Sequence, residues 1–309
     1  MQSEIIVTDS LTKFYGKIKG IEDISVEIPS GNVAFLGPNG AGKTTLIRTL
    51  LGIIHPTKGT ARVLGYDIRK EINKVRDRIG YVPEFNTSFI PDMTAMKFVA
   101  FCARMNGLSV SESKQRASDS LFYVGLDEER YRKLGTFSLG MKQKVKLATA
   151  LVHDPEIIIC DEPTNGLDPT GRVQMLSLIR SLQENEGKDI IFSSHLLRDV
   201  EQIADHTLVF SKGEIRAQGN IKDLTAGKRS SISIKVRSNQ DRFLQRLNDK
   251  GIESWIEGSY IESQMSHEVE KEIFKIANET NADIRYLGNR SRTLEDVFIN
   301  LFNKEELIE

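Results

Sequence analysis

The chain has 309 residues, enough for about two domains, and its 39% hydrophobic and 28% charged residues exclude a disordered polymer. The formal net charge of -1 excludes a global attraction to nucleic acid or to an anionic membrane surface. The two cysteines, Cys102 and Cys160, lie in apolar runs without metal-ligand spacing, which favours buried thiols in a reducing compartment.

The N-terminus combines an acidic residue, Glu4, with a short apolar stretch from Ile5 to Val7. This pattern does not predict a signal peptide. The sequence has no run of 18 or more apolar residues, so it does not predict a membrane-spanning helix. We expect a cytoplasmic protein that reaches a membrane only through a partner.

The first part of the chain predicts strands. Residues 5–27 alternate polar and apolar side chains, which is typical of half-buried antiparallel strands. The apolar run 32–36 predicts a buried strand, and 43–51 predicts a helix.

Between that strand and that helix lies the segment Gly37-Pro38-Asn39-Gly40-Ala41-Gly42-Lys43-Thr44, which fits a phosphate-binding loop. The glycines let backbone amides approach phosphates, Lys43 reaches the β- and γ-phosphates, and the Thr44 hydroxyl can ligate magnesium. A chance match in a glycine-containing turn is the alternative, and the flanking strand and helix argue against it. The residues predicted to bind ATP here are Gly37, Pro38, Asn39, Gly40, Ala41, Gly42, Lys43, Thr44 and Thr45.

Strand patterns disappear between about Pro91 and Tyr131, where apolar residues recur at helical spacing. This predicts a helical insertion, which we place at about residues 91–150. Ser109 to Glu112 offers capping groups for one of its helices, and Asn106-Gly107 offers a break before it.

Two further Ile-rich runs, 156–160 and 189–193, precede polar residues. The alternation of such runs with helical patterns predicts an α/β fold with a largely parallel sheet. Asp161 and Glu162 follow the first run and His195 follows the second, so all three belong at the carboxyl edge of the sheet, where ligands bind. A solvated turn and a structural histidine are the alternatives.

After Gly227-Lys228-Arg229-Ser230 the pattern restarts. The order strand, helix, strand, strand, helix, strand predicts a ferredoxin-like accessory domain. We place the domains at residues 1–227 and 228–309. The expected elements are 231–236, 239–250, 252–256, 259–264, 267–280 and 282–286, with a final amphipathic helix at 293–302.

These motifs resemble those of ATP-binding cassette (ABC) proteins, from about residue 5 to residue 225. Phe137 to Gln143 resembles the signature motif, and Asp161 to Pro169 resembles the Walker B motif with the D-loop. Glu84 stands at the Q-loop position, Ser193-Ser194-His195 resembles the switch histidine, and Tyr15 resembles the aromatic residue that stacks on adenine. We expect Tyr15 to lie before the first pair of strands.

The resemblance implies a dimer that sandwiches two ATP molecules, each between the P-loop of one subunit and the signature segment of the other. Ser138, as a helix cap, and the Gly140 backbone would contact the γ-phosphate across the interface. Glu162 would act as the general base or orient the attacking water, and His195 would sense the γ-phosphate. The resemblance also implies that Thr44, Glu84 and Asp161 serve the magnesium ion.

Two positions depart from the commonest family pattern. The signature reads Ser-Leu-Gly-Met, which keeps the serine and the second glycine, and Glu84 replaces a glutamine. A carboxylate can still ligate magnesium. Both departures, and the tail from Ser291 to Phe298, resemble exporters with separate membrane chains, of the drug, lantibiotic, polysaccharide or copper-maturation type.

We therefore expect a transport-coupled ATPase with ATP and Mg²⁺ as cofactors. Its expected partners are permease subunits and a second ATPase subunit, in a homodimer on the inner face of the cell membrane, and no nucleic acid. A soluble cassette ATPase acting on ribosomes or DNA is one alternative, although the chain has one cassette and no coiled-coil insertion. A nucleotide-binding protein without turnover is the other, but Lys43 and Glu162 are both present.

Overall fold

The computed structural model describes residues 4–84, 89–225, 231–264 and 269–288, together with 294, 295 and 298. The chain divides into two compact units, Met1–Gly219 and Asn220–Glu309. Each unit has its own sheets and core and is described by itself.

The first unit begins with an antiparallel sheet of order β2-β1-β4-β5. Its strands are β1 (Glu4–Tyr15), β2 (Ile18–Pro29), β4 (Lys58–Val63) and β5 (Tyr66–Asp67). Ile24, Val26 and Ile28 are buried while Ser25 and Glu27 between them are exposed. The predicted antiparallel strands are confirmed.

A second sheet of six strands, in the order β10-β9-β3-β8-β7-β6, forms the centre of this unit. The strands are β3 (Asn32–Leu36), β6 (Ile79–Val82), β7 (Ile157–Cys160), β8 (Asp189–Ser194), β9 (His206–Ser211) and β10 (Glu214–Asn220). The pairs from β9 through β6 are parallel. Every residue of β3 and β7 is buried, as expected for strands covered on both faces.

Short and long helices connect these strands. They are α1 (Lys43–Leu50), α2 (Ile72–Arg76), α6 (Pro169–Glu186) and α7 (Leu197–Ile203). α1 follows β3 and α7 follows β8, so both helices begin at the carboxyl ends of parallel strands. This places the start of each helix where the predicted site residues lie.

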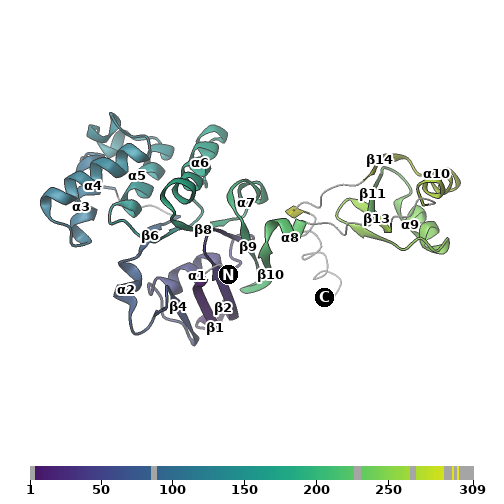
Figure 1. Cartoon of the computed structure of the whole chain (residues 1–309), viewed down its shortest axis with the longest axis horizontal. Helices are drawn as coiled ribbons and strands as arrows, with labels where there is room; N and C mark the ends of the chain where they lie inside the picture. Colours follow the sequence, from purple (N-terminus) through teal and green to yellow (C-terminus); the bar gives the residue numbers. More distant parts are fainter. Residues whose placement is uncertain are drawn as a thin grey trace. The chain divides into compact units, whose positions relative to one another are not determined.

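Three helices form a separate group in Figure 1: α3 (Ala95–Met105), α4 (Val110–Tyr123) and α5 (Leu139–Leu151). Two 3₁₀ turns, Glu129–Tyr131 and Leu134–Thr136, lie between α4 and α5. Ser109 caps α4 with a complete capping box that includes Glu112, so the predicted cap is confirmed.

The second unit starts with α8 (Ile221–Thr225), followed by a four-stranded antiparallel sheet of order β12-β13-β11-β14. Its elements are β11 (Ser231–Val236), α9 (Gln240–Asp249), β12 (Ser254–Glu257), β13 (Tyr260–Gln264), α10 (Val269–Thr280) and β14 (Ile284–Gly288). Ile234, Phe243, Ile261 and Ile273 are among its core residues. The linker 227–230 and most of the expected final helix 293–302 lie outside the described residues, although Leu294 is buried.

Neither cysteine forms a disulfide. Cys160 is fully buried, as expected, whereas Cys102 is only partly buried because it lies on a helix with an exposed face. Within the described ranges, no helix is long and apolar enough to cross a membrane.

Candidate active site

The predicted phosphate loop leaves β3 and ends in the first turn of α1, as the motif requires. Gly42 has φ +110, and a Cβ there would lie 2.8 Å from the carbonyl oxygen of Gly20. A Cβ on Gly37 would lie 2.5 Å from the carbonyl oxygen of Phe210. Only glycine fits these two positions, which is why the chain can turn so tightly next to a strand.

The loop borders a cavity of about 410 Å³. The residues that line it are Tyr15, Ile18, Lys19, Gly20, Asn39, Gly40, Ala41, Gly42, Lys43, Thr44, Thr45, Glu84 and Glu162. Most of the predicted ATP-binding residues therefore share one hollow. No local pattern points to the start of β2, residues 18–20, which the fold brings against the loop.

Tyr15 lies at the rim of this cavity, but not before the first strand pair as expected. It is the last residue of β1 and pairs with Ile18 across the β1–β2 hairpin. The ring is 44% exposed, and Lys13 Nζ lies 5.3 Å from its centroid. The hairpin, rather than a preceding loop, presents the aromatic ring.

Lys43 is buried and held from two sides. Its Nζ donates to the carbonyl oxygens of Gly37 at 2.6 Å and Pro38 at 3.2 Å. Glu162 Oε1 lies 3.1 Å from the same nitrogen, and both side chains are no more than 5% exposed. The lysine charge is thus fixed beside the loop and balanced by a buried carboxylate.

Asp161 is joined to the loop through Thr44. Its Oδ1 accepts hydrogen bonds from Thr44 Oγ1 at 3.0 Å and from Ser193 Oγ at 2.7 Å. Its Oδ2 is buried and has no hydrogen-bond partner among the described residues. Burial raises the pKa of Asp161 above its ordinary value.

Glu162 occupies an unusual backbone position at the end of β7. Its φ of +48 is in the left-handed region, which residues other than glycine rarely adopt and which is common at functional sites. Its amide donates to Ser193 Oγ at 2.8 Å, and its Oε2 lies 2.9 Å from His195 Nδ1. Sheet pairing of β7 with β8 therefore brings Glu162 and His195 into contact at the carboxyl edge of the sheet, the edge where the sequence places both.

Glu84 follows β6 and lines the same cavity. Its Oε1 accepts from Asn165 Nδ2 at 3.2 Å, and its backbone carbonyl accepts from Lys146 Nζ at 3.2 Å. Burial, and then the negative charge of Asp161, raise the pKa of Glu84. This carboxyl group, the Thr44 hydroxyl and the free Oδ2 of Asp161 are hard oxygen donors.

These oxygens suit Mg²⁺, which binds through one or two carboxylates together with waters and substrate phosphates. The described part of the chain contains no group of three or more His, Cys, Asp or Glu residues that could hold a metal ion unaided. The residues therefore fit an ion that arrives with a phosphate ligand, rather than a closed protein site.

The signature segment lies elsewhere on the same unit. Ser138 is the N-cap of α5, and its Oγ accepts from the amide of Met141 at 3.3 Å. It belongs to a second hollow of about 470 Å³, lined by Ser138, Leu139, Gly140, Met141, Lys144, Gly166, Leu167, Asp168, Thr170, Gly171, Gln174 and Met175. Within one chain, neither Ser138 nor Gly140 lines the P-loop cavity, so the cap prediction holds while the two binding segments remain apart.

Some site residues escaped the sequence reasoning. Ser193 Oγ donates to Asp161 Oδ1 and accepts from the amide of Glu162. Only its place in the Ser-Ser-His run could have indicated these contacts. Buried Thr164 and Asp199 form a polar cluster with the half-buried Arg172 nearby. These residues are far apart in sequence, so their local patterns do not predict the contact.

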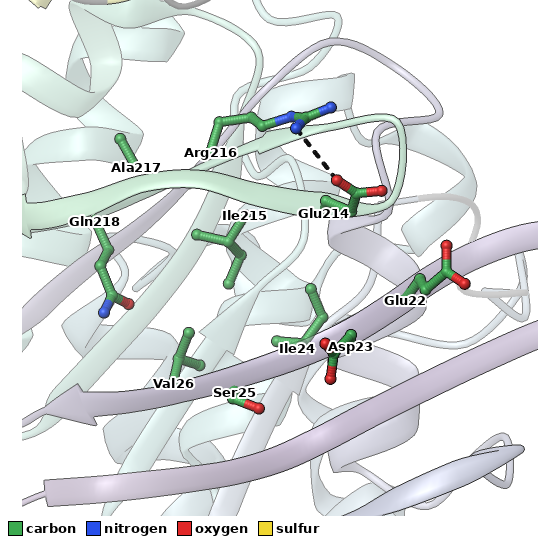
Figure 2. A pocket seen from close by; sticks show the side chains of 10 residues that line it. All are labelled: Glu22, Asp23, Ile24, Ser25, Val26, Glu214, Ile215, Arg216, Ala217 and Gln218. Atoms are coloured by element: carbon green, nitrogen blue, oxygen red, sulfur yellow. Dashed lines mark ion pairs between the residues drawn. The ribbon is translucent and has the colours of Figure 1, made fainter.

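A larger hollow of about 600 Å³ lies between β2 and β10 and contains none of the predicted site residues. Figure 2 shows its polar walls, with an ion pair of 3.2 Å between Arg216 and Glu214. Size alone does not identify the chemistry. The smaller cavity carries the glycine loop, the lysine and the carboxylates.

Comparisons with known proteins agree with this geometry. The profile of the family described as ABC transporter matches residues 21–165. The chain is 41% identical to the bacitracin transport ATP-binding protein BcrA of Bacillus licheniformis, over 69% of both chains. It is 37% identical to the linearmycin resistance ATP-binding protein LnrL of Bacillus subtilis, over 78% of both chains. Among solved structures it resembles a dimeric ATP-binding cassette in a post-hydrolysis state bound to ADP and Pi, with a TM-score of 0.63, 25% identity, and coverage of 70% of this chain and 98% of that one.

Proposed function

The chain belongs to the ATP-binding subunits of ABC transporters and hydrolyses ATP, and from this premise we propose that it drives export through separate membrane permease subunits. The family membership extends to the fold of the first unit, a P-loop α/β cassette with an antiparallel subdomain.

The observation that carries the proposal is the group formed by Lys43, Glu162 and His195 beside the glycine loop. Lys43 and the loop amides bind the β- and γ-phosphates. Glu162 accepts a proton from, or orients, the attacking water. A carboxylate can only accept, so His195 donates to Glu162 through Nδ1, and a second donation from Nε2 to the γ-phosphate oxygens requires the doubly protonated ring.

Thr44, Glu84 and Asp161 are the residues that would hold a magnesium ion. When bound, Mg²⁺ neutralises charge that develops on the β- and γ-phosphate oxygens. Ser193 fixes the Asp161 carboxylate through Oδ1, and the other oxygen, Oδ2, has no hydrogen-bond partner among the described residues. Tyr15 stacks on adenine at the cavity rim.

The separation of the two hollows supports a homodimer. Ser138 and the Gly140 amide stand at the start of α5, where the helix terminus favours an anion. They would complete the site of a second copy. A related cassette is dimeric in its solved structure.

The relatives named above act in bacitracin transport and linearmycin resistance. We propose a related export role, with the chain on the inner face of the cell membrane through its permease. The compact units divide at Gly219 and Asn220, and we propose functional domain limits slightly later, at 1–227 and 228–309. We also propose a helical insertion at 91–150 and a ferredoxin-like accessory domain that packs against or stabilises the dimer. The order β12-β13-β11-β14 supports that last assignment.

Co-purification from a detergent extract tests the transport role. A tagged chain should retain a polytopic membrane protein, and Pi release by the purified chain should depend on Mg²⁺. Recovery of ribosomal RNA in place of a membrane protein would favour a soluble cassette ATPase and contradict the proposal.

A further inference from the structure

A buried carboxylate joins three separate segments behind the active site. Asp199, on α7, is 1% exposed. Its Oδ2 accepts from Thr164 Oγ1 at 2.7 Å, and its Oδ1 lies 2.5 Å from both Nε and a terminal nitrogen of Arg172. Both carboxylate oxygens are therefore occupied, and by different segments.

Thr164 and Asp199 each lie close in sequence to a proposed active-site residue. Thr164 is two residues after Glu162, and Asp199 is four residues after His195. Glu162 and His195 are already in contact at 2.9 Å. The bond between Thr164 and Asp199 is a second link between the same two segments, in the interior of the unit.

The Thr164 segment also continues toward the signature hollow. The amide of Leu167 donates to the carbonyl of Thr164 at 3.2 Å, and Leu167 and Asp168 line that hollow together with Ser138. Asp168 caps α6, the helix that carries Arg172 in its first turn. The carboxylate of Asp199 thus holds the start of α6 and the wall of the signature hollow against the segment that carries His195.

We propose that Asp199 is a positioning residue that couples the hydrolytic group of each subunit to the signature face of the same subunit. In a dimer that face belongs to the other ATP site, so the state sensed at His195 in one site biases the geometry of the second. This coupling rests on the dimeric ATPase proposed above. It assigns to Asp199, Thr164 and Arg172 no contact with the nucleotide.

The test measures ATP turnover by the full chain as a function of ATP concentration. If the wild type shows positive cooperativity between its two sites, with a Hill coefficient above 1, Thr164→Val and Asp199→Asn should lower it toward 1. We also expect kcat to fall by roughly tenfold or more while ADP affinity, measured by calorimetry, stays within about twofold. Thr164→Ser, which restores the hydroxyl, should recover both kcat and the Hill coefficient.

Arg198→Gln is the matched control, because Arg198 is exposed on the same helix. Unchanged kcat and cooperativity in folded Thr164→Val and Asp199→Asn would overturn the proposal. So would loss of ADP binding and of the thermal transition in both, because Asp199 would then only stabilise the fold. Absence of Mg²⁺-dependent turnover in the wild type would contradict the proposed function. Turnover with a Hill coefficient of 1 in the wild type would contradict only the coupling.

Discussion

The P-loop half of the candidate site, around Lys43, and the signature half, around Ser138, differ in how many hydrogen bonds and ion pairs their polar side chains make within the chain. On the P-loop side, Lys43 has three oxygen neighbours and Asp161 Oδ1 has two donors. On the signature side, Ser138 bonds only to the first turn of its own helix among the contacts described, and Leu139 is 49% exposed.

This difference indicates what each half must do before ATP is cleaved. The P-loop half is organised in advance, so we expect ATP to displace Glu162 from Lys43 rather than to build a site. The signature half is organised only by the Ser138 helix cap and leaves Leu139 exposed. Binding and turnover should therefore be separable by mutation, the first depending on one half and the second on both.

Glu162→Gln should have the largest effect on ATP turnover while leaving the structure of the P-loop half unchanged. Loss of the carboxylate should lower turnover by about 10²- to 10⁴-fold, because a general base contributes that much, while ATP stays bound in a stable dimer. Pi release and size-exclusion chromatography with ATP measure both. Glu156→Gln, which removes an exposed carboxylate before the same strand, is the control, and full turnover in Glu162→Gln would refute the role of Glu162.

Lys43→Ala should break the P-loop half itself. A hydrogen bond to a charged group contributes about 1.5–3 kcal/mol, so ATP affinity should fall about 10- to 150-fold. Binding of a fluorescent ATP analogue measures this. The exposed Lys58→Ala should bind normally, and wild-type affinity in Lys43→Ala would remove the lysine from the phosphate site.

Ser138→Asp should break only the signature half. Aspartate caps helices about as well as serine, so the melting temperature should hardly change, but its charge repels the γ-phosphate across the interface. Turnover should fall about 10- to 100-fold, the equivalent of about 1.4–2.7 kcal/mol, with unchanged ADP affinity. Ser138→Ala distinguishes the two tasks, because it loses the cap at a cost of about 1 kcal/mol without adding charge. Normal turnover in Ser138→Asp would place the serine outside the site.

Tyr15→Ala should have the smallest effect, since the ring is partly exposed at the cavity rim. Stacking of a base on an aromatic ring contributes about 1 kcal/mol or more, so the affinity for ATP should fall about fivefold. Tyr15→Phe should bind like the wild type. Competition between ATP and GTP sharpens the test, and equal affinity of Tyr15→Ala and wild type would exclude adenine stacking.

Much of the P-loop half follows from contiguous sequence. The residues from Gly37 to Thr44 are contiguous and act through their backbone amides and the side chains of Lys43 and Thr44, so strand, loop and helix patterns suffice to place them. Asp161, Glu162 and His195 required one further step, the rule that parallel strands present ligands at their carboxyl edge. Pairing of β7 with β8 is the physical reason that this step works.

Contacts that depend on side-chain packing could not be predicted in this way. The pairing of Lys43 with Glu162 and the contacts of Asp199 join residues far apart in sequence, and nothing in their local patterns distinguishes them from solvated charges. The expectation that Tyr15 lies before the first strand pair was wrong for a related reason. Alternating polar and apolar residues show that strands exist but not where a turn interrupts them.

Cys160 has a consequence for how the enzyme withstands oxidants. The thiol sits directly before Asp161, yet it is fully buried, and burial raises its pKa to about 12. Because the thiolate is the reactive form, this sulfur stays protonated at neutral pH and out of reach of peroxide or alkylating reagents. The cysteine next to Asp161 and Glu162 is therefore shielded from oxidation by its burial.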